Sequence, residues 1–269
     1  MDILRNPTSE QIITAIEQNL FAWIPILGKM GSAVDNDPIG VKRVKCDRPT
    51  ALFNSVMDAQ LHPGQVESTI THIQSDARQR KVPLLWWISP STRPADVEQH
   101  LIDHGFVIDE ASPGMAVDLT QLNENLRLPE GLTVQLAQDD ASFRVWTTAL
   151  AAGFEFPPSL KHVEDTWYDF LRLTDVEIIQ AYTGLLNRKP VATSLLFLAA
   201  GVAGIYAVGT APEVRRKGIG TWMTFYPLLQ ARRRGYNYGV IEASEMGESV
   251  YRSLGFQEYC RINSYRWRP

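Results

Sequence analysis

The feature that most constrains the fold is a basic, glycine-containing stretch that runs from Glu213 to Thr221. An apolar run ends just before it at Val208, and a helical pattern of apolar residues continues beyond it. A strand that enters a helix through such a turn leaves several backbone N–H groups pointing one way, at the positive end of the helix dipole. Because Gly218 and Gly220 carry no Cβ, a ligand can approach the backbone closely. The stretch therefore predicts a strand, turn and helix that bind phosphate.

The spacing of its glycines separates this stretch from the common nucleotide-binding motifs, because it is neither G-x-G-x-x-G nor G-x-x-x-x-G-K-S/T. It resembles Gln/Arg-x-x-Gly-x-Gly/Ala, the pyrophosphate loop of the GNAT superfamily of acyl-coenzyme A-dependent N-acyltransferases. On the residues alone, a basic turn before an ordinary amphipathic helix is the alternative. The resemblance implies that the coenzyme contacts Arg215, Arg216, Lys217, Gly218, Ile219, Gly220 and Thr221.

Periodicity and turn residues divide the chain into helices and strands. The first half reads as helix 9–30, strands 41–45 and 51–57, helix 63–81, strand 84–88, helix 95–104 and strand 115–119. The second half reads as strand 132–136, helices 141–152 and 159–173, strands 176–184, 191–198 and 202–210, helix 219–234, strand 239–243, helix 247–254 and strand 261–267. This second order resembles the GNAT fold over essentially all of residues 131–269. Pro227 predicts a kink in the helix that contains it.

The two halves look like copies of one unit. A strand, a short helix and a closing strand end each half, and the helices stop at Gly105-Phe106 and Gly255-Phe256. The offset of about 150 residues is typical of a domain. We therefore expect an α/β (α+β) chain of two GNAT-like domains, 1–125 and 131–269, each with a mixed, mostly antiparallel sheet flanked by helices. Only the second carries the loop, so the first is expected to be a degenerate copy that binds no coenzyme A.

Composition limits the partners that the chain can have. The 269 residues are 45% hydrophobic and carry a formal net charge of −4, which argues against a general nucleic-acid surface. Cys46 and Cys260 lie far apart without metal-ligand spacing, and the first residues lack the pattern of a secretory signal. We expect free thiols, no metal and a cytoplasmic protein.

One uncharged segment, from Val191 to Val208, is about long enough to cross a bilayer. Polar residues and glycines interrupt it, and Ala199-Ala200-Gly201 resembles a hairpin turn. We therefore expect two buried strands here and no contact with a membrane.

Acyl transfer to an amine requires a neutral amine, a group that stabilises the oxyanion and an acid for the leaving thiolate. The resemblance implies that Val208, Gly209 and Thr210 present backbone groups to the pantetheine arm where the fourth and fifth strands separate. The alternative for these three residues is a purely structural role, as the end of a strand that packs against its neighbours. Tyr251, four residues before Gly255, is the expected acid, and its alternative is an aromatic anchor for a short helix.

The general base is left unassigned by the sequence. Glu242 and Glu245 flank Ser244, which we include among the residues that contact the coenzyme. Glu155 lies in the apolar loop 154–158, which should overhang the substrate side. A solvated carboxylate is the alternative for each glutamate.

Two other clusters of ionisable residues give weaker evidence of a functional site. His100 and His104 lie four residues apart on a helix, as metal ligands can, but no third ligand is evident and we favour a solvated helix face. The run Arg232-Arg233-Arg234 falls at the end of a helix, where cations complement the dipole.

These features predict an acetyl-CoA-dependent N-acyltransferase that transfers an acetyl group directly to a primary amine of a small molecule. Trp146, Trp167 and Tyr206 suggest a partly aromatic acceptor pocket. The alternative, motivated by the missing base, is a non-enzymatic coenzyme A-binding sensor or interaction protein. An acyl donor larger than acetyl stays open, and the protein is expected to be a monomer or a homodimer.

Overall fold

The computed structural model describes residues 2–28, 33–37, 40–157 and 160–269. Backbone contacts divide the chain into two compact units, which are considered separately below. Unit 1 contains Met1–Thr8 and Met115–Glu258, and unit 2 contains Ser9–Gly114 and Tyr259–Pro269. The ends of the helices expected at 9–30 and 159–173, and the end of the loop expected at 154–158, fall partly outside the described residues.

This division differs from the boundary near 125–131 that the duplication suggested. Strand β5 (Val107–Asp118) and strand β11 (Gln257–Trp267) each contribute residues to both units. Both are longer than the segments expected at 115–119 and 261–267. The first half of β5 was missed because its residues are exposed and because the adjacent pair Val107 and Ile108 is followed by Asp109 and Glu110, so that no apolar alternation marks it.

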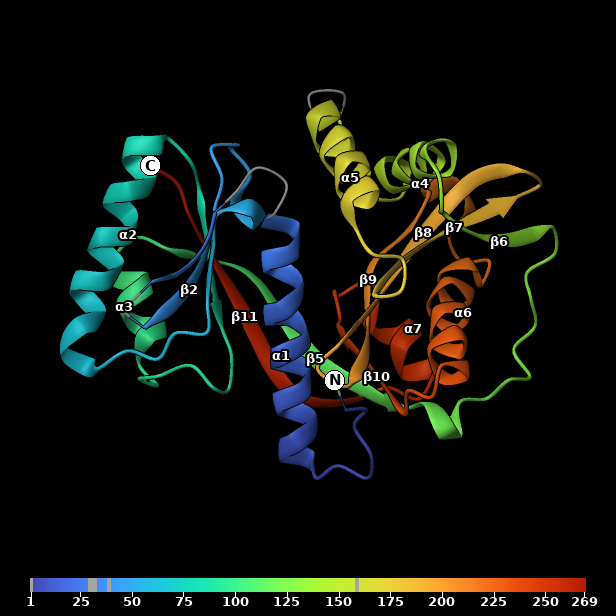
Figure 1. The fold of residues 1–269 in the computed structure, drawn as a ribbon, viewed down its shortest axis with the longest axis horizontal. Helices are drawn as coiled ribbons and strands as arrows, with labels where there is room; N and C mark the ends of the chain where they lie inside the picture. The colour runs from blue at the N-terminus through green and yellow to red at the C-terminus, as the bar shows by residue number, and fades with distance from the viewer. Residues whose placement is uncertain (1, 29–32, 38–39, 158–159) are drawn as a thin grey trace. The chain divides into compact units, whose positions relative to one another are not determined.

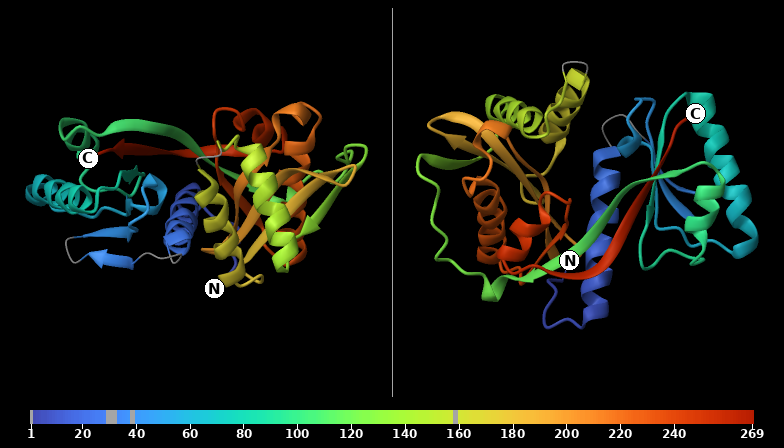
Figure 2. Two further views of the ribbon diagram at one scale, coloured as in Figure 1. Left: turned by 90° about the horizontal axis from the view of Figure 1, so that it is seen from above. Right: turned by 180° about the vertical axis from the view of Figure 1, so that it is seen from behind.

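Unit 1 is built on a mixed, mostly antiparallel sheet (Figure 1). Its strands follow the order β5-β10-β9-β8-β7-β6. The pair β9 and β10 is parallel, and the pairs β6–β7, β7–β8 and β8–β9 are antiparallel. Figure 2 shows α4 and α5 on one side of this sheet and α6 and α7 on the other. The elements are β6 (Leu132–Leu136), α4 (Asp140–Gly153), α5 (Lys161–Leu173), β7 (Ile179–Leu186), β8 (Lys189–Ala199), β9 (Val202–Thr210), α6 (Ile219–Arg233), β10 (Tyr238–Glu242) and α7 (Glu248–Ser253), with 3-10 turns at Leu119–Gln121 and Pro212–Val214.

The uncharged segment 191–208 forms the antiparallel pair β8 and β9 in the middle of this sheet. Its turn is the expected hairpin, because Ala200 and Gly201 both adopt positive φ angles, 53° and 74°. Helices cover both faces, so successive residues such as Leu195 and Leu196 are both fully buried and the strand reads as a continuous apolar run. Among the described residues, no helix has the length and apolar character needed to cross a membrane.

Unit 2 has the strand order β1-β2-β3-β4-β11, in which β3 and β4 are parallel and the other neighbouring pairs are antiparallel. One face of α2 is fully buried against this sheet through Val66, Ile70 and Ile73. The strand at 33–37 was read as a loop from the sequence because its Asp and Asn residues are poor strand formers. The elements are α1 (Ser9–Gly28), β1 (Ala33–Asp37), β2 (Val41–Lys45), β3 (Ser55–Met57), α2 (Val66–Arg80), β4 (Leu84–Ile88) and α3 (Val97–Asp103), with 3-10 turns at Ala51–Phe53 and Pro63–Gln65.

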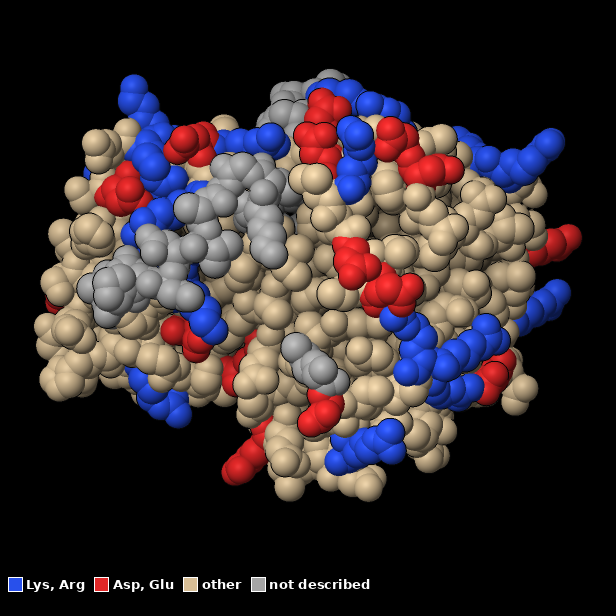
Figure 3. Space-filling view, in the orientation of Figure 1, with Lys and Arg blue, Asp and Glu red and all other residues tan. Residues whose placement is uncertain are grey.

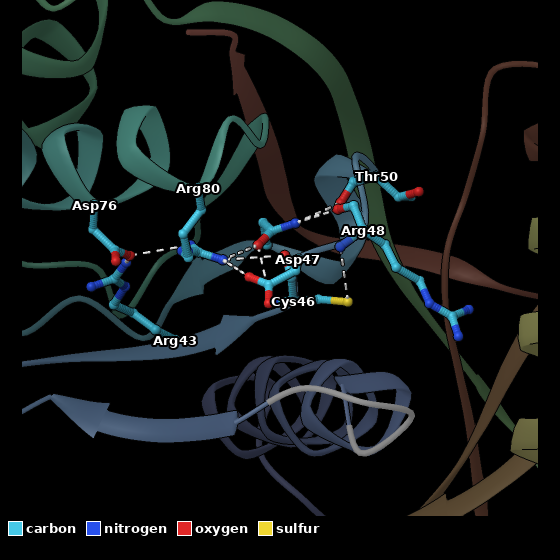
Figure 4. A network of polar contacts seen from close by, with 8 residues as sticks. Arg43, Cys46, Asp47, Arg48, Thr50, Asp76 and Arg80 are labelled. Atoms are coloured by element: carbon cyan, nitrogen blue, oxygen red, sulfur yellow. Dashed lines mark hydrogen bonds and ion pairs between the residues drawn. The ribbon is translucent and has the colours of Figure 1, made fainter.

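A polar network ties the end of β2 to α2 (Figure 4). Arg43 of β2 and Arg80 of α2 both donate to Asp76, at 2.5 and 3.1 Å. Burial alone would raise the pKa of Asp76, but the hydrogen bonds and charges of the two arginines lower it overall. Arg80 also donates to the backbone oxygen of Cys46 and to Asn54, so the free thiol of Cys46 lies in a tightly bonded loop. The network therefore stabilises unit 2.

Candidate active site

The fourth and fifth strands of unit 1 separate as the sequence predicted. The parallel pair β9 and β10 is in register only at Ala203 with Gly239 and at Gly204 with Val240. Beyond Gly204, β9 continues to Thr210 without further pairing to β10. The backbone groups of β9 that face this gap therefore have no strand partner, and a ligand can use them.

A β-bulge lies in β9 beside the gap. Thr193 of β8 pairs with Gly209, whereas Leu195 pairs with Tyr206, so β9 holds one extra residue. Ala207 adopts a φ of 50°, and its carbonyl oxygen accepts a hydrogen bond of 2.8 Å from Thr193 Oγ1. A bulge redirects the backbone of the residues that follow it. It thus turns the backbone of Val208 at the mouth of the gap.

The loop after β9 carries a series of backbone donors with no acceptor. Among the described residues, the backbone N–H groups from Arg216 to Thr221 form no recorded hydrogen bond, and the first helical bond runs from Trp222 N to Gly218 O. No side chain caps the helix at Gly218. These six consecutive groups lie at the positive end of α6 and beside two cationic side chains, Arg216 and Lys217. This arrangement is typical of an anion-binding nest.

The two loop glycines, Gly218 and Gly220, differ in how well the backbone there would accept a side chain. Gly218 adopts a φ of 76°, a conformation that other residues adopt only with strain. At Gly220 a Cβ would meet only Thr210 Oγ1, at 3.6 Å, which is an ordinary contact. The protein itself therefore tolerates a side chain at Gly220, and the space beside it is free for a ligand.

Arg215 joins three segments that meet at the end of β9. Its Nε donates to Thr210 O at 2.9 Å, and its Nη2 donates to Gly153 O at 3.1 Å and to Glu155 Oε1 at 2.7 Å. Glu155, one of the candidate bases, is thus held in an ion pair beside the loop. Phe154 packs so closely on Gly209 that a methyl group there would lie 2.9 Å from the ring. The turn after α4 therefore covers the end of β9.

Tyr251 lies on α7 within the buried core of unit 1 and is 6% exposed. Its ring packs against Phe256 at 5.9 Å, and a methyl group at Gly247 would lie 2.7 Å from it. Burial raises the pKa of its hydroxyl to about 12, with no contribution from a neighbouring charge. The hydroxyl therefore stays protonated at neutral pH, while its ring serves as an anchor for α7.

Glu242 and Tyr206 approach each other from β10 and β9. Burial raises the pKa of Tyr206 well above its ordinary value, and the charge of Glu242 raises it further. Glu242 and Tyr206 are therefore close enough across the neighbouring strands for the charge of Glu242 to act on the tyrosine hydroxyl. Ser244 and Glu245 are exposed, and Ser244 accepts a hydrogen bond from Gly247 N at the start of α7.

Two of the aromatic residues expected in the acceptor pocket are core residues. Trp146 is fully buried, donates to Ser194 O at 3.3 Å and packs on Trp167. Phe154 instead is 46% exposed and lies 5.9 Å from Phe156. The exposed aromatic surface near the site therefore comes from the turn after α4, in the loop that the sequence expected to overhang the substrate side.

The corresponding place in unit 2 is closed. Beyond the parallel pair β3 and β4, Arg93 N donates to Ala59 O at 2.8 Å, and Leu61 N donates to Arg93 O at 3.0 Å. The donors of the following turn are also occupied, because Gly64 N donates to His62 Nδ1 and His62 N donates to Gln65 Oε1. Neither the gap nor the series of free donors is present in the described part of this unit.

The charged clusters outside the site are mostly paired. His100 and His104 are partly exposed, and both contact the exposed Glu67 of α2, His104 at 3.2 Å. The described residues nevertheless contain no group of three or more side chains that could hold a metal ion. In the arginine run at the end of α6, Arg232 and Arg234 pair with acidic residues. Figure 3 shows charges of both signs scattered over the face viewed, without a broad basic surface.

The sequence and the structure were compared with known proteins, and only the structural comparison found similar proteins. No protein-family model matches the sequence, and no curated protein matches it either. A GCN5-related N-acetyltransferase from Kribbella flavida superimposes with a TM-score of 0.71 over 94% of this chain and 95% of its own, at 18% identity. The chain has the GNAT fold.

Further solved structures support the GNAT fold over the whole length. A tandem GNAT protein from the clavulanic acid biosynthesis pathway, solved without AcCoA, matches at a TM-score of 0.63 and 14% identity, covering 100% of this chain and 97% of its own. A GCN5-related N-acetyltransferase from Sphaerobacter thermophilus matches at 0.63 and 20% identity, covering 80% and 73%. The GNAT fold of this chain thus includes both of its units.

Proposed function

We propose that the protein is an acetyl-CoA-dependent N-acetyltransferase with one active site, in unit 1. The observation that carries the proposal is the series of free backbone donors from Arg216 to Thr221, at the positive end of α6 and beside the gap in the sheet. A diphosphate needs many donors and positive charge at close range, which this loop supplies. Coenzyme A carries such a diphosphate and an extended arm that fits a strand edge.

Three groups of residues would hold the coenzyme. The backbone N–H groups from Arg216 to Thr221 bind the diphosphate, and Arg215 holds this loop against β9. The backbone of Val208, Gly209 and Thr210, along the edge of β9 that does not pair with β10, binds the pantetheine arm. Ser244, exposed at the start of α7, contacts the coenzyme near its sulfur.

The proton transfers follow from the environment of Tyr251. A free thiol has a pKa of about 8.5. Complete transfer of a proton from a phenol of pKa about 12 to the thiolate is therefore uphill by about 3 to 4 pKa units, or about 5 kcal/mol. Tyr251 works best as a hydrogen-bond donor that keeps its proton and stabilises the departing thiolate, while the proton that the amine loses passes to the general base. The backbone N–H groups at the bulge stabilise the oxyanion.

Glu242 is the carboxylate that best fits the role of base. It is half-buried at the end of β10, and its charge acts on Tyr206 of β9. Glu155 fits less well, because its carboxylate pairs with Arg215. The acceptor we propose is a primary amine of a small molecule, since Phe154 and Phe156 give the entrance apolar surface.

Unit 2 is proposed to be a degenerate copy that binds no coenzyme A. The hydrogen bonds of Arg93 close the gap there, and His62 and Gln65 occupy the donors of its turn. The two free cysteines fit a cytoplasmic location.

The test is calorimetric titration of the intact protein with acetyl-CoA, followed by a thiol-release assay with polyamines, amino acids, aminoglycosides and peptides. We expect one coenzyme per chain and thiol release that depends on one class of amine. If the intact protein does not bind coenzyme A, the proposal is refuted. Binding without thiol release for any amine would favour a sensor instead, and release only from longer acyl-CoA would change the donor.

A further inference from the structure

Unit 2 contains a cavity of about 380 Å³ that the proposed function does not use. Asp58 and Ser91, which line it, follow the carboxyl ends of the adjacent parallel strands β3 and β4. Lys42 comes from β2, and α1 closes the cavity with Glu17 and Phe21, one turn apart. Open α/β sheets hold ligands in the crevice outside the carboxyl ends of parallel strands. The cavity therefore lies between α1 and the carboxyl ends of these strands, beside the backbone bonds of Arg93 that close the strand gap of unit 2.

Glu17 is the unusual member of the lining. It is only 5% exposed, on a helix face otherwise made of apolar residues such as Ile16 and Leu20. Its Oε1 accepts a hydrogen bond of 2.7 Å from Ser91 N, and no hydrogen bond to Oε2 is recorded among the described residues. A buried carboxylate is costly unless it is paired and fully hydrogen-bonded. One backbone donor satisfies Glu17 only in part, which leaves an acceptor for a cationic ligand.

The other charges of the cavity point to the same kind of ligand. Asp58 is already paired with Lys42, at 2.7 Å. The lining thus holds two carboxylates and one ammonium group, which leaves one net negative charge. A metal ion is disfavoured because Lys42 lies in the same cavity and the described residues offer no set of metal ligands. An organic ammonium group fits, since its three donors can reach Glu17 Oε2 and the Ser91 hydroxyl.

We propose that this cavity binds a small primary alkylammonium compound, at a site separate from the active site of unit 1. Its ammonium group pairs with Glu17, and its carbon chain packs on Phe21, a buried aromatic residue of the lining. The site does not require bound acetyl-CoA.

The experiment is calorimetric titration of the full chain with putrescine, a diamine, and with 1,4-butanediol, a neutral compound of the same chain length. Glu17→Gln removes the charge and keeps an acceptor for Ser91 N. We expect it to weaken putrescine binding about tenfold to a hundredfold, the range for a charge-assisted hydrogen bond. Glu10→Gln, an exposed change on the same helix, should leave the affinity unchanged. Butanediol should not bind.

Lys42→Gln provides an independent test if Glu17→Gln fails to fold. Lys42 is 45% exposed, so its replacement should be tolerated, and it frees Asp58 to attract the ligand. Putrescine should then bind more tightly than to the wild type. Absence of putrescine binding to the wild type, or equal affinities in the wild type and both variants, would overturn the proposal. Because acetyl-CoA titrations report separately on unit 1, either proposal can fail while the other stands.

Discussion

Replacement of Tyr251 by phenylalanine removes a single hydroxyl group from the core of unit 1. The side chain is 6% exposed, and burial raises the pKa of the hydroxyl from 10.0 to about 12. A shift of about two pKa units corresponds to about 3 kcal/mol of preference for the neutral form in the folded protein. The variant keeps the ring and its contact with Phe256, so its stability at neutral pH should stay within about 1 kcal/mol of the wild type.

The sign of the pH dependence follows from the raised pKa. Below pH 10 both the folded and the unfolded chain hold the proton, so the contribution of Tyr251 is fully present. Above pH 10 the unfolded chain ionises first, and the contribution is lost as the pH rises towards about 12. Over this window the free energy of unfolding of the wild type should fall by up to about 3 kcal/mol more than that of Tyr251→Phe. Other tyrosines with raised pKa values titrate in both proteins and cancel.

Urea denaturation of both proteins at pH values from 7 to 12 measures this difference. The thiol-release rate of Tyr251→Phe at pH 7, with an amine that the wild type accepts, should fall by about 10² to 10⁴, while acetyl-CoA still binds. Parallel stability curves for the two proteins would refute the argument from burial. An unchanged rate would refute the catalytic role and leave Tyr251 as an anchor for α7.

Four further changes test the site. Gly220→Glu should abolish acetyl-CoA binding without lowering the melting temperature, because a Cβ there meets no close neighbour; Gly64→Glu, in the turn of unit 2, is the matched control in the same titration. Glu155→Gln should cost at most about 1 kcal/mol in denaturant unfolding, as for exposed ion pairs, and should strengthen acetyl-CoA binding by removing a negative charge beside the loop. Glu242→Gln should lower kcat by about 10² or more and remove one limb of the pH–rate profile. Gly153→Ala should destabilise unit 1 by about 1–3 kcal/mol in thermal unfolding, because its methyl group would lie 2.9 Å from the backbone of Gly209.

Local patterns in the sequence predicted the parts of the fold that depend on nearby residues. The turn at Ala200-Gly201, the loop before α6 and the stop of α7 at Gly255 all follow from short-range backbone rules. The approach of Glu242 to Tyr206 could not be predicted, because it depends on where two strands separate. The contact between Arg215 and Glu155, 60 residues apart in the chain, likewise requires the folded structure.

The cavity of unit 2 did leave a signal in the sequence. Glu17 follows Ile13 and precedes Phe21 at steps of four, so a carboxylate interrupts an apolar helix stripe. That pattern marks a buried charge, but it does not identify the partner. Ser91 N, which binds it, comes from a turn 74 residues later. The kind of ligand became apparent only when the neighbouring charges of Lys42 and Asp58 were known.

The placement of β11 has a consequence for how the protein is made. Residues Asn263 to Trp267 of β11 pair with β4, so unit 2, which begins at Ser9, lacks a strand until the segment around residue 267 has been synthesised. On a ribosome, β4 would expose an unpaired edge throughout the translation of unit 1, and such edges invite aggregation. Unit 1 draws on Met115–Glu258 for nearly all its residues, so the half translated later can reach its native form first. The order of folding would then run opposite to the order of translation.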